Sequence, residues 1–177
     1  YACERSATEA VLGKKGVNLR IAGKKAVLRF AYESGFLTIT LPSGRKLFYV
    51  KPRIEAEDLV RTNTAGVKYV AARAGTITYE GQDQKTKQWA RLTTYGGKLV
   101  ENITQAVARD CLAESMLALD NAGYTQLATV HDEIIMEMAG GTLKEAEKIM
   151  GEAIAWAPGL PLRGDGFETK YYMKEID

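Results

Sequence analysis

The sequence predicts an α+β fold in which helices pack on an antiparallel sheet. Three observations support this prediction: residues 37–41 alternate apolar side chains with threonine, residues 98–121 carry apolar side chains at helical spacing, and two short apolar runs flank a polar triplet at 131–133. The chain has 177 residues, 46% of them hydrophobic and 26% charged, which is typical of a globular protein with a core of its own. We divide it into a first segment, residues 1–90, and a second, residues 91–177.

Net charge and cysteine content exclude several classes of protein. The formal net charge of +2 is compatible with nucleic-acid binding but does not by itself indicate it. Cys3 and Cys111 are too few and too far apart for a disulfide framework or a zinc site, and we expect Cys111 to be a buried free thiol.

No apolar stretch approaches the ~18 residues that span a bilayer, and no secretory segment is visible, so no membrane partner is expected. We therefore expect a protein of the reducing cytosol. The chain begins at Tyr1 without a methionine, which suggests a cleaved, split or engineered fragment.

The first segment is expected to contain one helix and a hairpin. Residues 2–12 have a helical pattern that ends in the glycine and lysine stretch at 13–16. Residues 37–41 and 47–50 flank a Pro-Ser-Gly turn and are expected to pair as antiparallel strands.

The rest of the first segment gives weaker signals. Residues 55–65 are polar, and we expect a loop with a helical turn there. Residues 68–72 and 76–79 predict two further short strands, followed by a polar connection at 82–88.

The long helix and a hairpin open the second segment. The helix is expected over residues 98–121, with Gly123 as its stop signal. Residues 127–130 and 134–138 are short apolar β-runs that should pair as a buried hairpin, which forces residues 131–133 into the turn.

A capping box, Thr142 with Glu145, predicts another helix that runs to about Trp156. The Ala-Pro-Gly stretch at 157–159 should end it, and residues 160–172 are expected as a last extended strand. The order of elements at this end is therefore helix, hairpin, helix and strand.

His131, Asp132 and Glu133 are the first candidate functional group. Two adjacent carboxylates at a hairpin tip repel each other unless a cation offsets their charge. Mg²⁺ suits such hard oxygen ligands, since it binds one or two carboxylates and completes its shell with water and phosphates. His131 is the only histidine, which argues against zinc and favours a hydrogen bond to a phosphate or sugar. The alternative is that all three are solvated turn residues.

A polar stripe on the long helix is the second candidate. Its residues are spaced four, three and four apart and fall on one side of a helix: Lys98, Asn102, Gln105 and Arg109. Such side chains reach phosphates and the minor-groove acceptors that all base pairs share, which suits DNA binding without sequence preference. A solvated helix face remains the alternative.

The order of these two features resembles a known family. Residues 95–112 (YGGKLVENITQAVARDCL) resemble the helix that follows the fingers in phage-type family A DNA polymerases, which are polymerase I-like. Residues 129–133 (TVHDE) with Glu137 resemble that family's motif C. Residues 156–162 (WAPGLPL) resemble its carboxyl terminus, and residues 41–45 with Trp89 its intervening hairpin region.

The resemblance implies that the second segment is part of the polymerase palm and that the first includes elements derived from the fingers. Asp132 would be the motif C metal ligand and Glu133 its acidic neighbour, both at a two-metal Mg²⁺ site. His131 would contact the primer terminus. Gln105 and Asn102 would contact the minor groove of primer–template DNA, and our geometric reading adds two basic residues, Lys98 and Arg109.

Two parts of such an active site are not visible in the sequence. Nothing resembles the motif A aspartate run, and residues 2–12 lack the fingers-helix pattern that grips a deoxynucleoside triphosphate. Because two-metal nucleotidyl transfer needs both, we expect activity only with an amino-terminal polymerase chain or fragment that supplies them. The alternatives are a non-catalytic DNA-binding or assembly module and, less well supported, a metal-dependent nuclease.

Overall fold

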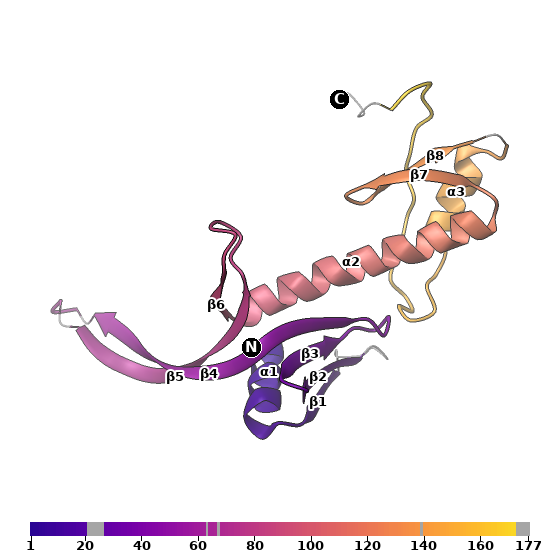
Figure 1. Cartoon of the computed structure of the whole chain (residues 1–177). Helices are drawn as coiled ribbons and strands as arrows, with labels where there is room; N and C mark the ends of the chain where they lie inside the picture. The colour runs from indigo at the N-terminus through magenta and orange to yellow at the C-terminus, as the bar shows by residue number, and fades with distance from the viewer. Residues whose placement is uncertain (21–26, 63, 67, 139, 173–177) are drawn as a thin grey trace. The chain divides into compact units, whose positions relative to one another are not determined.

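The computed structural model describes residues 1–20, 27–62, 64–66, 68–138 and 140–172 (Figure 1). The chain divides into two units, Tyr1–Thr104 and Gln105–Asp177. Its elements in chain order are α1 (Ala2–Gly13), β1 (Gly16–Arg20), β2 (Val27–Glu33), β3 (Phe36–Thr40), β4 (Lys46–Thr62), β5 (Lys68–Gln82), β6 (Trp89–Thr94), α2 (Gly96–Asn121), β7 (Thr125–Val130), β8 (Glu133–Glu137) and α3 (Leu143–Met150). The predicted α+β class with antiparallel sheets is confirmed.

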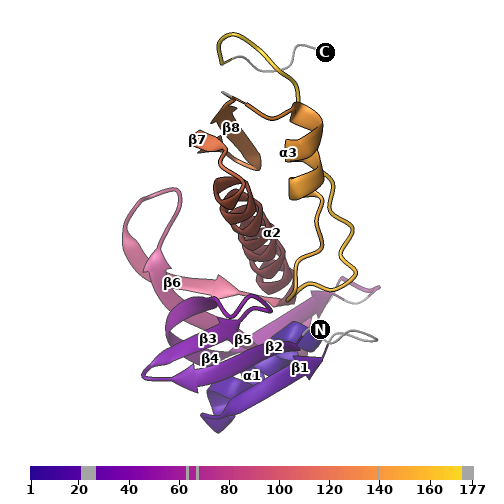
Figure 2. The same ribbon diagram turned by 90° about the vertical axis from the view of Figure 1, so that its right-hand side faces the viewer.

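The first unit is a six-stranded antiparallel sheet with one covering helix. The strands follow one another in chain order from β1 to β6, and α1 contacts β1 to β4 (Figures 1 and 2). Residues of β2, β3 and β5 supply much of the core, and in β3 the three successive residues 37–39 are all buried. Its large, fully buried side chains are Phe30, Leu37, Ile39, Leu41, Ile77 and Leu99.

The predicted helix at the start of the chain is confirmed as α1. Lys14, with φ 46, forms the left-handed C-cap, and its N–H donates to the carbonyl of Ala10. The helix therefore ends on a lysine in the conformation that glycine usually supplies. The strand that follows, β1, is not predicted from the sequence, because its Gly-Val-Asn-Leu-Arg run is short and only pairing with β2 makes it a strand.

The predicted hairpin between β3 and β4 is confirmed, but β4 is much longer than expected. Phe36 pairs with Val50, and the Pro-Ser-Gly turn lies between the strands. The loop expected at residues 55–65 is wrong up to Thr62, which pairs with Lys68 of β5. Among the described strands, only β5 pairs with this part of β4.

The strand β5 also corrects the sequence prediction. The two short strands expected at 68–72 and 76–79 form one continuous strand, which pairs with β4 on one side. On its other side it pairs with β6, a strand that the sequence analysis did not predict. A register shift between Val50 and Arg53 places an extra residue in β4, where Lys51 has φ 43.

Helix α2 begins in the first unit and continues into the second, and its predicted end is confirmed. Gly123, with φ 88, donates its N–H to the Asp120 carbonyl, and the Tyr124 N–H donates to the Leu119 carbonyl. Cys111 is a buried free thiol, as expected, and burial raises its pKa.

The capping box of α3 is confirmed, but the helix ends earlier than predicted. Thr142 Oγ1 accepts from the Glu145 N–H, and the Glu145 carboxylate accepts from the Thr142 N–H. The helix ends at Met150, because Gly151 caps it, rather than at Trp156. The Trp156 indole instead donates to Glu114 Oε1 at 2.9 Å.

The final strand expected at residues 160–172 is wrong, since this stretch pairs with no strand among the described residues. It packs on α3 instead. Gly164 lies so close that a Cβ there would be 2.8 Å from the Glu147 Cα, and the Gly166 N–H donates to Glu147 Oε1 at 3.1 Å. In the part of the chain that the structure describes, no helix is long and apolar enough to cross a membrane.

Candidate functional site

The hairpin of β7 and β8 carries the predicted polar triplet. Val130 pairs with Glu133, so His131 and Asp132 form a two-residue turn and Glu133 is the first residue of β8. The turn is thus one residue shorter than the sequence predicts, because strand pairing begins at Glu133. Asp132 lies in the turn, whereas the backbone of Glu133 is held by its pairing with Val130.

The backbone at His131 is strained. Its φ of 55 lies in the left-handed region, which non-glycine residues adopt rarely. A two-residue hairpin turn requires this conformation because it matches the twist of the flanking strands, and glycine or asparagine usually supplies it. A histidine in this position costs about 1–2 kcal/mol relative to an ordinary backbone conformation. Such strain is common in functional turns.

The three side chains of the turn are exposed to solvent. Among the described residues, the structure gives no hydrogen bond or ion pair to the side chain of His131, Asp132 or Glu133. Two carboxylates and an imidazole therefore stand next to one another at the end of a hairpin with their polar atoms available to a ligand.

The hairpin is less buried than the sequence predicts. No residue of β7 or β8 is fully buried, and Leu127 is 61% exposed. A register shift between Gln126 and Ala128 places Leu127 as an extra residue in β7, which interrupts the alternation of the strand. The expected buried hairpin is therefore wrong, because the bulge turns an apolar side chain toward solvent.

Gln126 anchors the hairpin to α2 within the second unit. Its Nε2 donates to the carbonyl of Met116 at 2.6 Å. Its Oε1 is buried without a hydrogen-bond partner in the described part of the chain. A buried acceptor without a partner costs about 1–3 kcal/mol. This cost offsets part of the stabilisation that the bond from Nε2 contributes.

The predicted polar stripe lies on α2, and its residues differ in how far they are already engaged. Lys98 Nζ forms an ion pair with Glu101 at 3.1 Å, and Asn102 is half-buried. Gln105 and Arg109 are exposed. Lys98 and Asn102 belong to the first unit and the other two to the second.

Asn102 has a specific partner within the first unit. Its Nδ2 donates to Tyr49 Oη at 3.0 Å. Tyr49 is buried, and its ring packs edge-on against Tyr79 with the centroids 5.0 Å apart. Burial raises the pKa of Tyr49, and the hydrogen bond with Asn102 partly opposes that rise. The Asn102 amide is therefore oriented by a fixed phenol before any ligand arrives.

The described residues form no complete metal site. No group of three or more His, Cys, Asp or Glu side chains is arranged there to hold a metal ion. Asp132 and Glu133 are adjacent hard oxygen donors, which fit Mg²⁺ as a partial ligand set.

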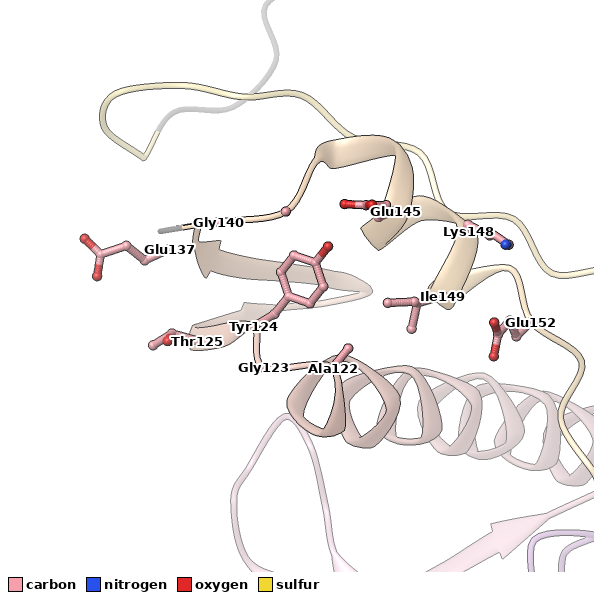
Figure 3. A pocket seen from close by; sticks show the side chains of 11 residues that line it. Ala122, Gly123, Tyr124, Thr125, Glu137, Gly140, Glu145, Lys148, Ile149 and Glu152 are labelled. Atoms are coloured by element: carbon pink, nitrogen blue, oxygen red, sulfur yellow. The ribbon is translucent and has the colours of Figure 1, made fainter.

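A pocket that the sequence analysis missed lies at the opposite end of the same hairpin. It has a volume of about 520 Å³ and is lined by the end of α2, the open ends of β7 and β8, and α3 (Figure 3). Tyr124 points between the hairpin and α3, and Gly141, with φ 81, leaves room for its hydroxyl. The glycine-rich stretch around Gly141 was the one available signal.

The fold and the turn together define an α+β chain that presents an exposed acidic hairpin. This chain is 46% identical over 177 residues to a DNA polymerase of Bacillus phage SP02. The alignment covers 99% of this chain and 24% of the relative, so the chain spans about a quarter of the length of the curated protein it matches. No family model and no solved structure matches. The chain is thus related to one part of a phage DNA polymerase.

Proposed function

We propose that this chain forms the motif C part of a family A DNA polymerase and that Asp132 is one of its metal-ligand carboxylates. The similarity to a phage DNA polymerase supports the polymerase activity. The free carboxylate at the hairpin turn supports the assignment of Asp132 as a metal ligand. The assignment of the second segment to the polymerase palm belongs to the same proposal.

The observation that carries the proposal is the contrast between two aspartates at hairpin turns. Asp83 Oδ1 accepts from the N–H of Lys85 and from the N–H and hydroxyl of Thr86, so its carboxylate builds the turn. Asp132 accepts no such bond among the described residues. The Asp83 carboxylate is therefore committed to its own turn, whereas the Asp132 carboxylate remains available to a ligand.

Mg²⁺, when bound, would neutralise charge on the attacking and leaving oxygens of nucleotidyl transfer. Asp132 would hold it by direct ligation, because it lies at the tip. Glu133 is held by pairing with Val130, and we assign it a weaker or outer position. His131 would donate a hydrogen bond to a phosphate or sugar oxygen of the primer terminus.

The polar residues of α2 would contact the duplex. Gln105 and Arg109 are exposed and would reach the minor groove and a phosphate respectively. Asn102 would use the amide atoms that Tyr49 leaves available. Lys98 would first have to leave Glu101, so its contribution is the smallest of the four.

The remaining parts of the active site would come from other parts of the polymerase. These are a second metal-bridging aspartate and the residues that grip the deoxynucleoside triphosphate, and they would be in the same polypeptide or in a separate amino-terminal chain. The chain alone is expected to give no primer extension.

The test is primer extension by this chain combined with an amino-terminal polymerase chain. Asp132→Ala is expected to reduce the extension rate by at least about a thousand-fold, since loss of a metal ligand removes several kcal/mol of transition-state stabilisation. Primer–template affinity should hardly change, because the turn contributes few of the phosphate contacts.

Asp120→Ala is the matched control, since Asp120 is another exposed aspartate of the same unit and should leave the rate unchanged. Full activity of Asp132→Ala, together with salt-dependent duplex binding, would instead favour a non-catalytic DNA-binding or assembly module. Robust extension by the chain without a partner would overturn the claim that it supplies only part of the site.

A further inference from the structure

The turn between β5 and β6, residues 82–89, has features that the nucleotidyl-transfer site does not use. It projects away from the rest of the sheet of the first unit in both views (Figures 1 and 2). Trp89, the first residue of β6, is 64% exposed. Exposure of so large an apolar side chain is unfavourable in water unless a partner covers it.

The turn is closed by backbone and side-chain hydrogen bonds among its own residues. Besides the bonds to the Asp83 carboxylate, the Asp83 N–H donates to the Gln88 carbonyl at 2.8 Å and the Lys87 N–H donates to the Asp83 carbonyl at 2.9 Å. The Gln82 side chain donates to the Lys87 carbonyl at 2.9 Å. Lys87 has φ 59, the left-handed conformation that this closure imposes.

The acidic groups around the turn are already compensated. Hydrogen bonds to the Thr86 backbone and hydroxyl lower the pKa of Asp83. Glu80 binds Lys51 at 2.9 Å and Arg91 at 3.2 Å, and its pKa is lowered first by the hydrogen bond from Lys51.

The cations of the turn are not compensated in the same way. Lys85 and Lys87 are exposed, and within the described residues neither ammonium group has an ion pair or hydrogen bond. The tip therefore combines two free positive charges with an exposed indole. Proteins that bind single-stranded nucleic acid use this combination: aromatic side chains stack on bases, and nearby cations bind the phosphates.

We propose that the β5–β6 turn binds single-stranded DNA, with a base stacked on Trp89 and the adjacent phosphates bound by Lys85 and Lys87. The proposed polymerase function identifies the strand as unpaired template, but the binding surface itself stands on the geometry of the turn.

The experiment uses the 177-residue chain with Trp156→Phe, which leaves Trp89 as its one tryptophan. Titration with a short oligothymidylate should quench the Trp89 emission, because stacking brings the base onto the indole. Trp89→Ala, followed by anisotropy of a labelled oligothymidylate, should weaken binding about ten-fold or more, and Trp89→Phe should retain part of the affinity.

The two lysines are tested by the salt dependence of binding. Lys85→Gln with Lys87→Gln should reduce the slope of log affinity against log salt by about 1.4, since each cation on a single strand contributes about 0.7. The matched control, Lys144→Gln with Lys170→Gln, removes the same charge from exposed lysines elsewhere and should leave the slope unchanged.

The proposal would be overturned if the Trp89 emission stayed unquenched on saturation with oligothymidylate. It would also be overturned if the wild-type chain and Trp89→Ala bound oligothymidylate equally well, or if the chain preferred duplex DNA and Trp89→Ala left that preference unchanged. If circular dichroism shows that Trp89→Ala does not fold, two measurements still test the proposal. These are the quenching of Trp89 emission in the chain with an unmodified turn and the affinity of Trp89→Phe for oligothymidylate. Asp132→Ala should bind oligothymidylate normally, so failure of this surface and failure of the proposed metal site give different results.

Discussion

The β5–β6 and β7–β8 hairpins both place a non-glycine residue in the left-handed region, but they differ in what holds them. Lys87 has φ 59 and His131 has φ 55. The β5–β6 turn is closed by several side-chain hydrogen bonds, whereas the described residues give the side chains of the β7–β8 turn none. Local polar chemistry thus builds the first turn and leaves the second chemically available.

Packing separates the two hairpins as clearly as hydrogen bonding does. Strand β5 lies between β4 and β6, and Ile77 and Thr78 within it are only 1% and 2% exposed. Strand β7 pairs with β8 alone in a two-stranded sheet without a fully buried residue. A two-stranded hairpin is marginally stable by itself, so the hairpin with the free carboxylates depends on its anchors to the helices of its own unit.

The largest expected difference between the hairpins is in amide hydrogen exchange. Amides of β5 around Ile77 should exchange at least about a hundred-fold more slowly than those of β7 and β8, because they open only with the sheet. Native-state exchange followed by mass spectrometry or NMR measures this directly. If the amides of both hairpins exchanged at equal rates, the claim that the two hairpins differ in packing would be wrong.

A second prediction tests whether Asp83 is structural. Its pKa is lowered from the usual 3.8, first by the Thr86 backbone hydrogen bond, so its charged form stabilises the folded state. That stabilisation is present above the unfolded pKa and is lost as pH falls through the folded pKa. Asp83→Asn should therefore lower the urea midpoint at pH 7, and the difference from wild type should disappear in acid below the folded pKa.

Asp132→Asn is the matched variant in the other turn. Since the Asp132 carboxylate makes no hydrogen bond within the described residues, the substitution should change the free energy of unfolding by less than about 0.5 kcal/mol. A loss of stability comparable to that of Asp83→Asn would show that Asp132 is also a turn-forming residue.

The sequence predicted elements well where local signals decide them. The capping box of Thr142 and Glu145, the stop at Gly123 and the hairpin around the Pro-Ser-Gly turn are all local in this sense. The extension of β4 to Thr62 could not be predicted in the same way, because its polar residues become a strand only by pairing with β5. Tertiary pairing overrides local composition in such a ribbon.

The candidate site shows the same limit. The triplet was visible as a polar interruption between two apolar runs, but its two-residue turn, the left-handed His131 and the bulge at Leu127 depend on strand register. The bond between Asn102 and Tyr49 joins residues far apart in sequence, so no spacing rule predicts it. The contrast between Asp83 and Asp132 likewise needs side-chain partners, which a sequence does not contain.

The smallest expected effect separates strain from function at His131. His131→Gly removes the cost of the left-handed conformation but increases the entropy of the unfolded chain, so the net gain in stability should be below about 1 kcal/mol. Lys14→Gly, at the left-handed C-cap of α1 with φ 46, should give a gain of similar size and serves as the control. In the combined polymerase, extension should fall several-fold for His131→Gly and remain unchanged for Lys14→Gly. If His131→Gly extended primers as fast as wild type, the histidine would be a tolerated turn residue and the strain would carry no functional meaning.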